Sequence, residues 1–399
     1  METPSTPSTS IYKKKLPSFV EARLNSFLRD MTEPYENRRP LPVSSRPGEG
    51  AVIMQSNDYL ALSFDDDIQT AHLNAIKTTN ENVVMSAVFL QDAEHKPEFE
   101  KRLAEFIGMD GCVLSQSGWT ANVGLLQTIC EPGTHVYIDF FAHMSLWEGA
   151  RIAGAQVIPF MHNSVSNLKR QIKKHGPGII LVDSVYSTIG TVAPLPAICE
   201  LAKELDCALV VDESHSLGTH GPGGSGLINE MEVRDQVDFV TTSLAKAFAY
   251  RAGAVLGPDN LIIALPFVSF PAIFSSTVLP QEVARLEATL DVIQNSDDKR
   301  RRLFEISDVL RAGLKEIGFN IRSESQIISL ECGDEQNTEH VRDFLESKGV
   351  FGAVFCSPAT PKNKAIIRFS LNADMSYREV DHVLTVCQAA YNHPDLRFY

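Results

Sequence analysis

Short apolar runs alternate with stretches of helical spacing through the middle of the chain. The runs predict buried strands at 112–115, 135–139, 156–160, 179–183, 207–212 and 237–242. The stretches between them predict helices at 120–129, 144–153, 165–174 and 195–205. Strands that alternate with helices in this way form a mostly parallel sheet covered on both faces. The pattern therefore predicts an α/β fold for this region.

The pattern differs on either side of this region. The N-terminal part predicts a helix at 17–31 and a strand at 51–54. Beyond Pro280 it predicts a long helix at 281–314, strands at 327–330, 352–355 and 366–371, and helices at 338–348 and from 377 onward. We expect an N-terminal arm (1–60), a large α/β domain (61–280) and a smaller α+β domain (281–399). The charge run at 297–302 is expected to be a solvated helix face.

Composition narrows the class of protein. The chain has 36 basic and 50 acidic residues, a net charge of −14, which argues against a nucleic-acid or anionic-membrane partner. Seven cysteines without a Cys-x-x-Cys pair suggest reduced thiols in a cytoplasmic protein. Residues 1–10 are rich in Pro, Ser and Thr, which predicts disorder rather than a signal peptide, and no apolar run is long enough to span a membrane. Lys13–Lys15 could contact a phosphorylated substrate, but we favour a solvated tail.

Reactive side chains follow the strands at 207–212 and 237–242. Ligands bind at the carboxyl ends of such strands, and Asp212, His215 and Lys246 stand there. Among small and apolar neighbours Lys246 would lose ammonium hydration, as a Schiff-base lysine requires, although an exposed lysine at a helix start is the alternative. Asp212 could hold a protonated pyridine nitrogen, as in a cofactor that acts as an electron sink, or it could cap the following turn.

Three further segments carry candidate chemistry. Gly118 joins a strand to a helix whose N–H groups suit a phosphate, and the adjacent Trp119 could pack on a cofactor ring or on the core. His143 could stack on a ring or act in acid–base catalysis. Asp139 and His143 have metal-ligand spacing, but no third ligand is suitably spaced, so we expect no metal. The run 221–226 fits G-x-G-x-x-G without lying directly between a strand and a helix, and is interpreted as a flexible loop.

Together these motifs resemble the α-oxoamine synthases, a branch of the fold-type-I pyridoxal-phosphate enzymes. The matching segments are 57–60, 117–122, 143–145, 186–190, 212–218, 243–246, 274–277 and 368–371. Longer runs at 114–119, 137–151, 243–253, 270–277 and 321–328 resemble the quorum-sensing autoinducer synthases within that family. The resemblance implies a homodimer, with its active site at the subunit interface, that condenses a medium-chain acyl-coenzyme A with a small amino donor resembling 2-aminobutyrate. The product would be a long-chain amino-ketone autoinducer.

The resemblance also implies residue roles. Lys246 would hold pyridoxal phosphate as an aldimine and remove the α-proton, and Asp212 would keep the pyridine nitrogen protonated. His143 would stack on the ring, and His215 would bond its phenolic oxygen. Further cofactor contacts are implied for Ser117, Gly118, Trp119, Ser187 and Ser243, with Ser275 and Ser276 reaching the phosphate of the second subunit. Asn57 and Arg368 would orient the amino donor.

The chain departs from the family pattern in places. The stretch 91–100 matches only loosely, Ser243 replaces a threonine, and the histidine usual after the motif at 368–371 is missing. These departures favour a divergent substrate. Two alternatives are a housekeeping α-oxoamine synthase with a short acyl donor and a non-catalytic scaffold subunit, against which the presence of Lys246 argues.

Overall fold

A computed structural model describes residues 15–32, 39–79, 83–91 and 98–399. The N-terminal tail 1–10, Lys13 and Lys14, and residues 92–97 of the loosely matching stretch lie outside the described residues. Within the described ranges, none of the helices is both long and apolar enough to cross a membrane.

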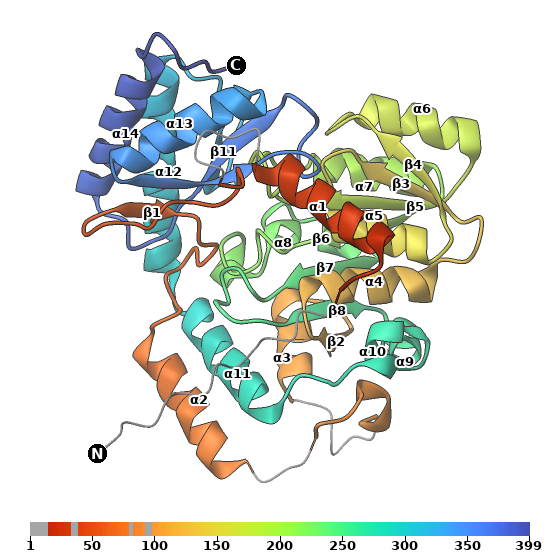
Figure 1. Ribbon diagram of the computed structural model, residues 1–399. Helices are drawn as coiled ribbons and strands as arrows, with labels where there is room; N and C mark the ends of the chain where they lie inside the picture. The colour runs from red at the N-terminus through yellow and green to blue at the C-terminus, as the bar shows by residue number, and fades with distance from the viewer. Residues whose placement is uncertain (1–14, 33–38, 80–82, 92–97) are drawn as a thin grey trace, which may run out of the picture.

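A seven-stranded sheet forms the larger part of the molecule (Figure 1), in the order β2-β8-β7-β6-β5-β3-β4. All neighbouring pairs are parallel except the two that involve β8, so the predicted mostly parallel α/β sheet is confirmed. β8 was not predicted, because its apolar run is short and starts and ends with glycine. The strands are β2 (Gly111–Ser115), β3 (His135–Asp139), β4 (Gln156–Phe160), β5 (Ile179–Asp183), β6 (Ala208–Asp212), β7 (Phe239–Ser243) and β8 (Gly253–Gly257).

Both faces of this sheet are covered, which explains why its strands are apolar throughout. Alternate residues point to opposite faces: Val136 and Ile138 of β3 join one core cluster, and Tyr137 between them joins the other. The first cluster includes side chains of α4 (Gly118–Ile129), α5 (Met144–Ile152) and α9 (Asp259–Val268). The second includes side chains of α3 (Glu98–Ile107), α6 (Val165–His175), α7 (Leu195–Glu204) and α8 (Leu227–Glu230), and it continues into the C-terminal part of the chain.

A second, four-stranded sheet has the order β1-β10-β11-β9. Its first strand, β1 (Val52–Met54), comes from the N-terminal region and pairs in parallel with β10 (Val350–Phe355). The other strands are β9 (Ile327–Gly333) and β11 (Ala365–Ser370), and α12 (Asp297–Ile317), α13 (Glu335–Ser347) and α14 (Tyr377–Tyr391) lie in the same part of the molecule (Figure 1). The predicted helices and strands of this region are confirmed apart from the long helix, whereas the three domain boundaries stay a prediction.

The predicted single helix at 281–314 is wrong: it is two helices, α11 (Pro280–Gln294) and α12. They separate where the backbone N–H groups of Asn295 and Ser296 bond to carbonyls three residues back, those of Val292 and Ile293. The remaining helices are α1 (Ser18–Thr32), α2 (Asp66–Thr78), which packs on α11, and the short α10 (Phe270–Phe274).

The expectation of a fully solvated charge run is also wrong at one position. Arg300 is buried, and it donates hydrogen bonds to the carbonyls of Ile293 (2.6 Å) and Gly218 (3.4 Å) while pairing with Asp297. The run 221–226, predicted to be a flexible loop, contains a 3₁₀ turn at Pro222–Gly224 and packs beside Arg300. The hydrophobic periodicity and the charges of the sequence did not predict that Arg300 would bond to a carbonyl near the end of α11 and to that of Gly218.

The segment between β6 and α8 is anchored by a buried carboxylate. Glu213 is fully buried and accepts hydrogen bonds from the backbone N–H groups of Leu227 (2.7 Å) and Ile228 (3.1 Å), at the start of α8. Burial raises the pKa of Glu213 to about 7, although these hydrogen bonds and one from Ser216 oppose the shift.

We expect Glu213 to make the stability depend on pH between about 4.5 and about 7. Because the folded state binds this proton more tightly than the unfolded chain, its contribution falls as pH rises, by about 3 kcal/mol in total. Urea unfolding from pH 4.5 to 8 measures the trend. Glu213→Gln should flatten it, whereas Glu200→Gln, on the exposed face of α7, should leave it unchanged; identical trends in all three proteins would contradict this assignment.

Candidate active site

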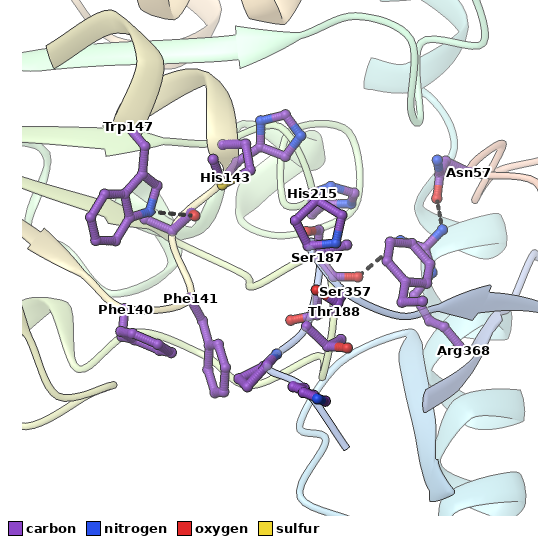
Figure 2. A pocket seen from close by; sticks show the side chains of 18 of the residues that line it. Asn57, Phe140, Phe141, His143, Trp147, Ser187, Thr188, His215, Ser357 and Arg368 are labelled. Atoms are coloured by element: carbon purple, nitrogen blue, oxygen red, sulfur yellow. Dashed lines mark hydrogen bonds between the residues drawn. The ribbon is translucent and has the colours of Figure 1, made fainter. Parts of the chain in front are cut away.

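The carboxyl ends of β6 and β7 bring Asp212 and Lys246 to one edge of the large sheet. The two strands are parallel, with Asp212 opposite Thr241, and Lys246 stands in the turn after β7. Two adjoining cavities open there, and His143, His215 and Lys246 line both of them. The smaller, inner cavity also contains Asp212, Gly118 and Ser243. The outer cavity has a volume of about 600 Å³ and is shown in Figure 2.

Asp212 is buried, and its carboxylate is held by two donors. Asn122 Nδ2 donates to Oδ2 (2.8 Å), and the backbone N–H of Ser214 donates to Oδ1 (2.9 Å). The structure is therefore compatible with both roles predicted for Asp212. The carboxylate caps the turn after β6, and it also lines the inner cavity, where it could hold a pyridine nitrogen. Asn122 was not predicted as a site residue; it also donates to Ser145 Oγ (2.8 Å), which places it between Asp212 and α5.

The N-terminus of α4 closes another side of the inner cavity. Ser117 is the N-cap, and its hydroxyl accepts from the backbone N–H of Thr120 while the Thr120 hydroxyl bonds back. Gly118 is the first residue of α4, and the backbone N–H groups of this first turn have no hydrogen-bond partners within the helix. A Cβ added at Gly118 would lie 2.6 Å from Ser243 Cβ, so the close approach of α4 to β7 requires glycine. Ser117 caps the helix but does not line either cavity.

His143 is the N-cap of α5, where its Nδ1 lies 2.8 Å from Ser145 Oγ. Solvent reaches the ring through the cavity, but the surrounding protein and the Lys246 charge lower the pKa of His143, with Asp212 opposing them. Trp119 lies edge-on to this ring at 6.2 Å and is 46% exposed. Trp119 therefore does not pack in the core, which leaves the cavity as its environment.

His215 is buried and lines the inner cavity. Its carbonyl accepts from Gln326 Nε2 (2.8 Å), and its Nδ1 lies 2.6 Å from the Tyr59 hydroxyl. Burial lowers the pKa of His215 well below its usual value, and the positive charges of Lys246 and Arg368 add to this. A neutral imidazole has one donor and one acceptor nitrogen. The Tyr59 hydroxyl, which also donates to Asn57 Oδ1 (3.3 Å), holds Nδ1, so Nε2 is the nitrogen left for a ligand.

Lys246 is half-buried between the cavities rather than exposed at a helix start. Burial lowers the pKa of its ammonium group, the Arg368 charge lowers it further, and Asp212 opposes both. The structure thus provides the surroundings in which an amine is available as a nucleophile or base.

Arg368 lies across the outer cavity, on β11 of the small sheet (Figure 2). Its Nη1 donates to the Ser187 carbonyl (2.9 Å) and its Nη2 to Asn57 Oδ1 (3.0 Å), whereas its buried Nε has no partner in the described structure. The predicted pair Asn57 and Arg368 is therefore in contact. Ser187 holds the arginine by its carbonyl and lines the outer cavity, not the inner one.

The opposite wall of the outer cavity is apolar. It is formed by Phe140, Phe141, Met144 and Trp147, at the end of β3 and the start of α5. Trp147 Nε1 donates to the Ala142 carbonyl (3.2 Å), which fixes the indole across this turn. In Figure 2 this wall and the Asn57–Arg368 pair lie on opposite sides of the two histidines.

Two predicted cofactor residues do not reach either cavity of their own chain. Ser275 and Ser276 are exposed; the Ser275 hydroxyl donates to the Pro271 carbonyl, and the Ser276 carbonyl accepts from Gln116. Their assignment to a partner's site stays a prediction. Asp139 pairs with His162 (2.9 Å) instead of facing His143, and the described residues contain no group of three side chains suited to a metal.

Several supporting residues were missed because their roles depend on contacts between distant segments. Asn122, Ser145 and Ser214 hold Asp212 and His143, and Tyr59 contacts His215 from a position far away in the sequence. All four residues lie within the segments that match the family, which was the available signal. The contact made by Tyr59 has no signal in periodicity or spacing.

The chain is similar to known enzymes over nearly its full length. A family model described as aminotransferase class I and II matches residues 51–386. A CAI-1 autoinducer synthase of Vibrio campbellii is 66% identical over 385 residues, 96% of this chain and 98% of the relative. An 8-amino-7-oxononanoate synthase of Petrotoga mobilis is 31% identical, covering 85% and 88% of the two chains. A solved serine palmitoyltransferase with a PLP internal aldimine is 25% identical with a TM-score of 0.81, covering 93% and 96%.

Gly118→Ala should weaken binding of pyridoxal phosphate, by at least about tenfold, because the new Cβ would displace Ser243. Titration of the cofactor-free protein, followed by visible absorbance, measures the dissociation constant. Gly48→Ala is the matched control, since its Cβ would meet no atom within 4 Å. An unchanged affinity in Gly118→Ala would contradict the close packing.

Proposed function

Because the chain belongs to the aminotransferase class I and II family, with pyridoxal phosphate as cofactor, we propose that it synthesises a quorum-sensing autoinducer. The reaction transfers the acyl group of a medium-chain acyl-coenzyme A to the α-carbon of a small amino donor. The product is a long-chain amino-ketone. The 66% identity to a CAI-1 autoinducer synthase over 96% of the chain supports this assignment over the housekeeping members of the family.

The observation that carries the proposal is that Lys246 stands where the two cavities meet. A lysine that holds a cofactor and then removes a proton from the substrate must reach both molecules. The inner cavity offers a buried carboxylate and a helix N-terminus, which suit a pyridinium nitrogen and a phosphate. The outer cavity offers a guanidinium on one side and an apolar wall on the other, which suit an amino acid and an acyl chain.

The inner cavity fits the cofactor by its chemistry. A buried carboxylate without a cation is costly, and Asp212, which lines the cavity, has only two neutral donors, Asn122 and the Ser214 N–H. A protonated ring nitrogen would supply the missing charge. Trp119 and the first turn of α4 would hold the phosphate, with Ser243, and His143 would face the ring. When bound, pyridoxal phosphate supplies an electron sink for a carbon that loses a proton.

Lys246 and His215, beside the position that the cofactor would occupy, favour their neutral forms. The lowered pKa of Lys246 favours its free amine, and Nζ accepts the α-proton of the donor. The lowered pKa of His215 keeps that imidazole neutral, so it faces the cavity without adding charge. Tyr59 positions His215 through its contact with Nδ1. Asp212 and Arg368 place one buried charge of each sign on the two sides of this region.

Arg368 would bind the carboxylate of an amino-acid donor. Its Nη atoms are held by Ser187 and Asn57, and its buried Nε lacks a partner in the described structure, so a carboxylate would complete its hydrogen bonds. The deprotonated α-carbon then attacks the thioester carbonyl, a carbon–carbon bond forms, and coenzyme A leaves as its thiol. An amino-acid donor would finally lose its carboxylate as carbon dioxide.

The partners follow from this reaction. We propose a homodimer in which the exposed Ser275 and Ser276 reach the phosphate of the partner's site, since neither serine reaches a cavity of its own chain. A cytoplasmic location is also proposed, because all seven cysteines are free thiols, as a reducing compartment allows.

Product analysis tests the function. The purified protein, loaded with pyridoxal phosphate, is incubated with acyl-coenzyme A donors from two to twelve carbons and a panel of small amino donors, and products are identified by mass spectrometry. We expect amino-ketones from medium-chain donors, roughly a hundredfold faster than from acetyl-coenzyme A if four or more methylenes are buried. Preference for short acyl donors would instead indicate a housekeeping synthase, and no product from any pair would contradict the proposal.

Lys246→Ala should abolish turnover and the visible absorbance of covalently held cofactor, because no other described amine lines the inner cavity. Absorbance spectra and product formation measure both effects. Lys203→Ala, on the exposed face of α7, is the control and should retain both. A Lys246→Ala protein with unchanged spectrum and rate would disprove the role of this lysine.

A further inference from the structure

We propose that Phe140 sets the length of acyl chain that the protein accepts, by separating the outer cavity from a second apolar groove. This inference rests on the proposed function, since it concerns the acyl donor of that reaction. The groove has a volume of about 500 Å³ and is lined mainly by Phe140, Pro159, Phe160, Met161, His162 and Arg170. Phe140 also lines the outer cavity, so one ring borders both spaces.

Two aromatic rings form the partition between these spaces. Phe140 and Phe141 are adjacent, with centroids 5.9 Å apart and planes tilted by 60° (Figure 2). Phe141 lines the outer cavity, and its ring lies 4.7 Å from that of His162, which lines the groove. A hydrocarbon chain that follows the apolar wall of the cavity therefore meets this pair before it reaches the groove.

The two rings differ in how firmly they are held. His162 is fixed by hydrogen bonds at both nitrogens, to Asp139 (2.9 Å) and Thr191 (2.8 Å), and it supports Phe141 from behind. Phe140 is 53% exposed, and among the described aromatic residues it pairs with Phe141 alone. Phe140 is thus the ring that can change rotamer, whereas Phe141 is the fixed part of the partition.

The acyl chain is the ligand that fits this path. The amino donor is drawn to Arg368 on the other side of the cavity, and the thioester carbonyl must lie beside Lys246. From Lys246 the apolar wall of Phe141, Met144 and Trp147 leads toward Phe140. Hydrocarbon gains about fourfold in binding for each methylene removed from water. Acyl chains that end at Phe140 should bind more tightly with each added carbon, whereas longer chains should gain affinity only if the Phe140 ring moves.

The test compares acyl-chain profiles of the cofactor-loaded wild type, Phe140→Ala and Phe140→Trp. The value of kcat/KM is measured for saturated acyl-coenzyme A donors from four to sixteen carbons, and Kd for the matching non-reactive thioethers is measured by calorimetry. We expect Phe140→Ala to move the optimum to chains two to four carbons longer than the optimum of the wild type. Phe140→Trp should shorten the optimum. Met161→Ala, which alters only the groove, should weaken the longest chains in the Phe140→Ala background by about fourfold or more.

Tyr399→Ala is the matched control, because this ring is similarly exposed (51%) and lines neither space. Its profile should equal that of the wild type. Identical length profiles in the wild type and both Phe140 variants, in turnover and in thioether binding, would overturn the inference even with the proposed function intact. If no donor supports turnover, the proposed function fails, and the thioether profile still decides the role of Phe140.

Discussion

The parallel register between β6 and β7 is the constraint on which the site depends. It places Asp212 opposite Thr241, so the carboxylate and the turn that carries Lys246 emerge at one edge of the sheet. Gly253 of β8 pairs with both Ser243 and Ser115, and a Cβ there would lie 2.3 Å from the Ser117 carbonyl. The absence of that side chain lets the cap of α4 settle against the same edge. The backbone geometry of these strands therefore determines where the cofactor side of the site lies, independently of the side chains that line it.

The two cavities differ in the charge of the buried side chain that lines each of them. A buried carboxylate belongs to the inner one and a buried guanidinium to the outer one, and Lys246 lies within reach of both charges. Burial lowers the pKa of both histidines between them, so both imidazoles favour the neutral form. The arrangement gives each ligand one buried counter-charge. A second charged side chain at His143 or His215 would compete with the ligand for one of those charges.

Periodicity was sufficient to predict the central sheet because buried parallel strands are continuously apolar, and the motifs at their ends identified Lys246, Asp212, His143 and Arg368. It failed where structure depends on partners distant in sequence. The break between α11 and α12 is stabilised by Arg300, which looked like part of a solvated charge run. Tyr59, Asn122 and Ser214 contact residues of other segments, and the spacing of residues along the sequence does not predict such contacts. The four-strand order of the small sheet was hidden for the same reason.

That small sheet has a consequence for how the chain can be made. β1 is among the first structured segments to leave the ribosome, yet its neighbour β10 lies close to the last. All seven strands of the large sheet have been synthesised once β8 is complete, whereas β10 follows about a hundred residues later. β1 must meanwhile remain unpaired, with its apolar residues exposed to other nascent chains. Among the described strand pairs, β1 and β10 are thus the pair with the greatest separation in sequence.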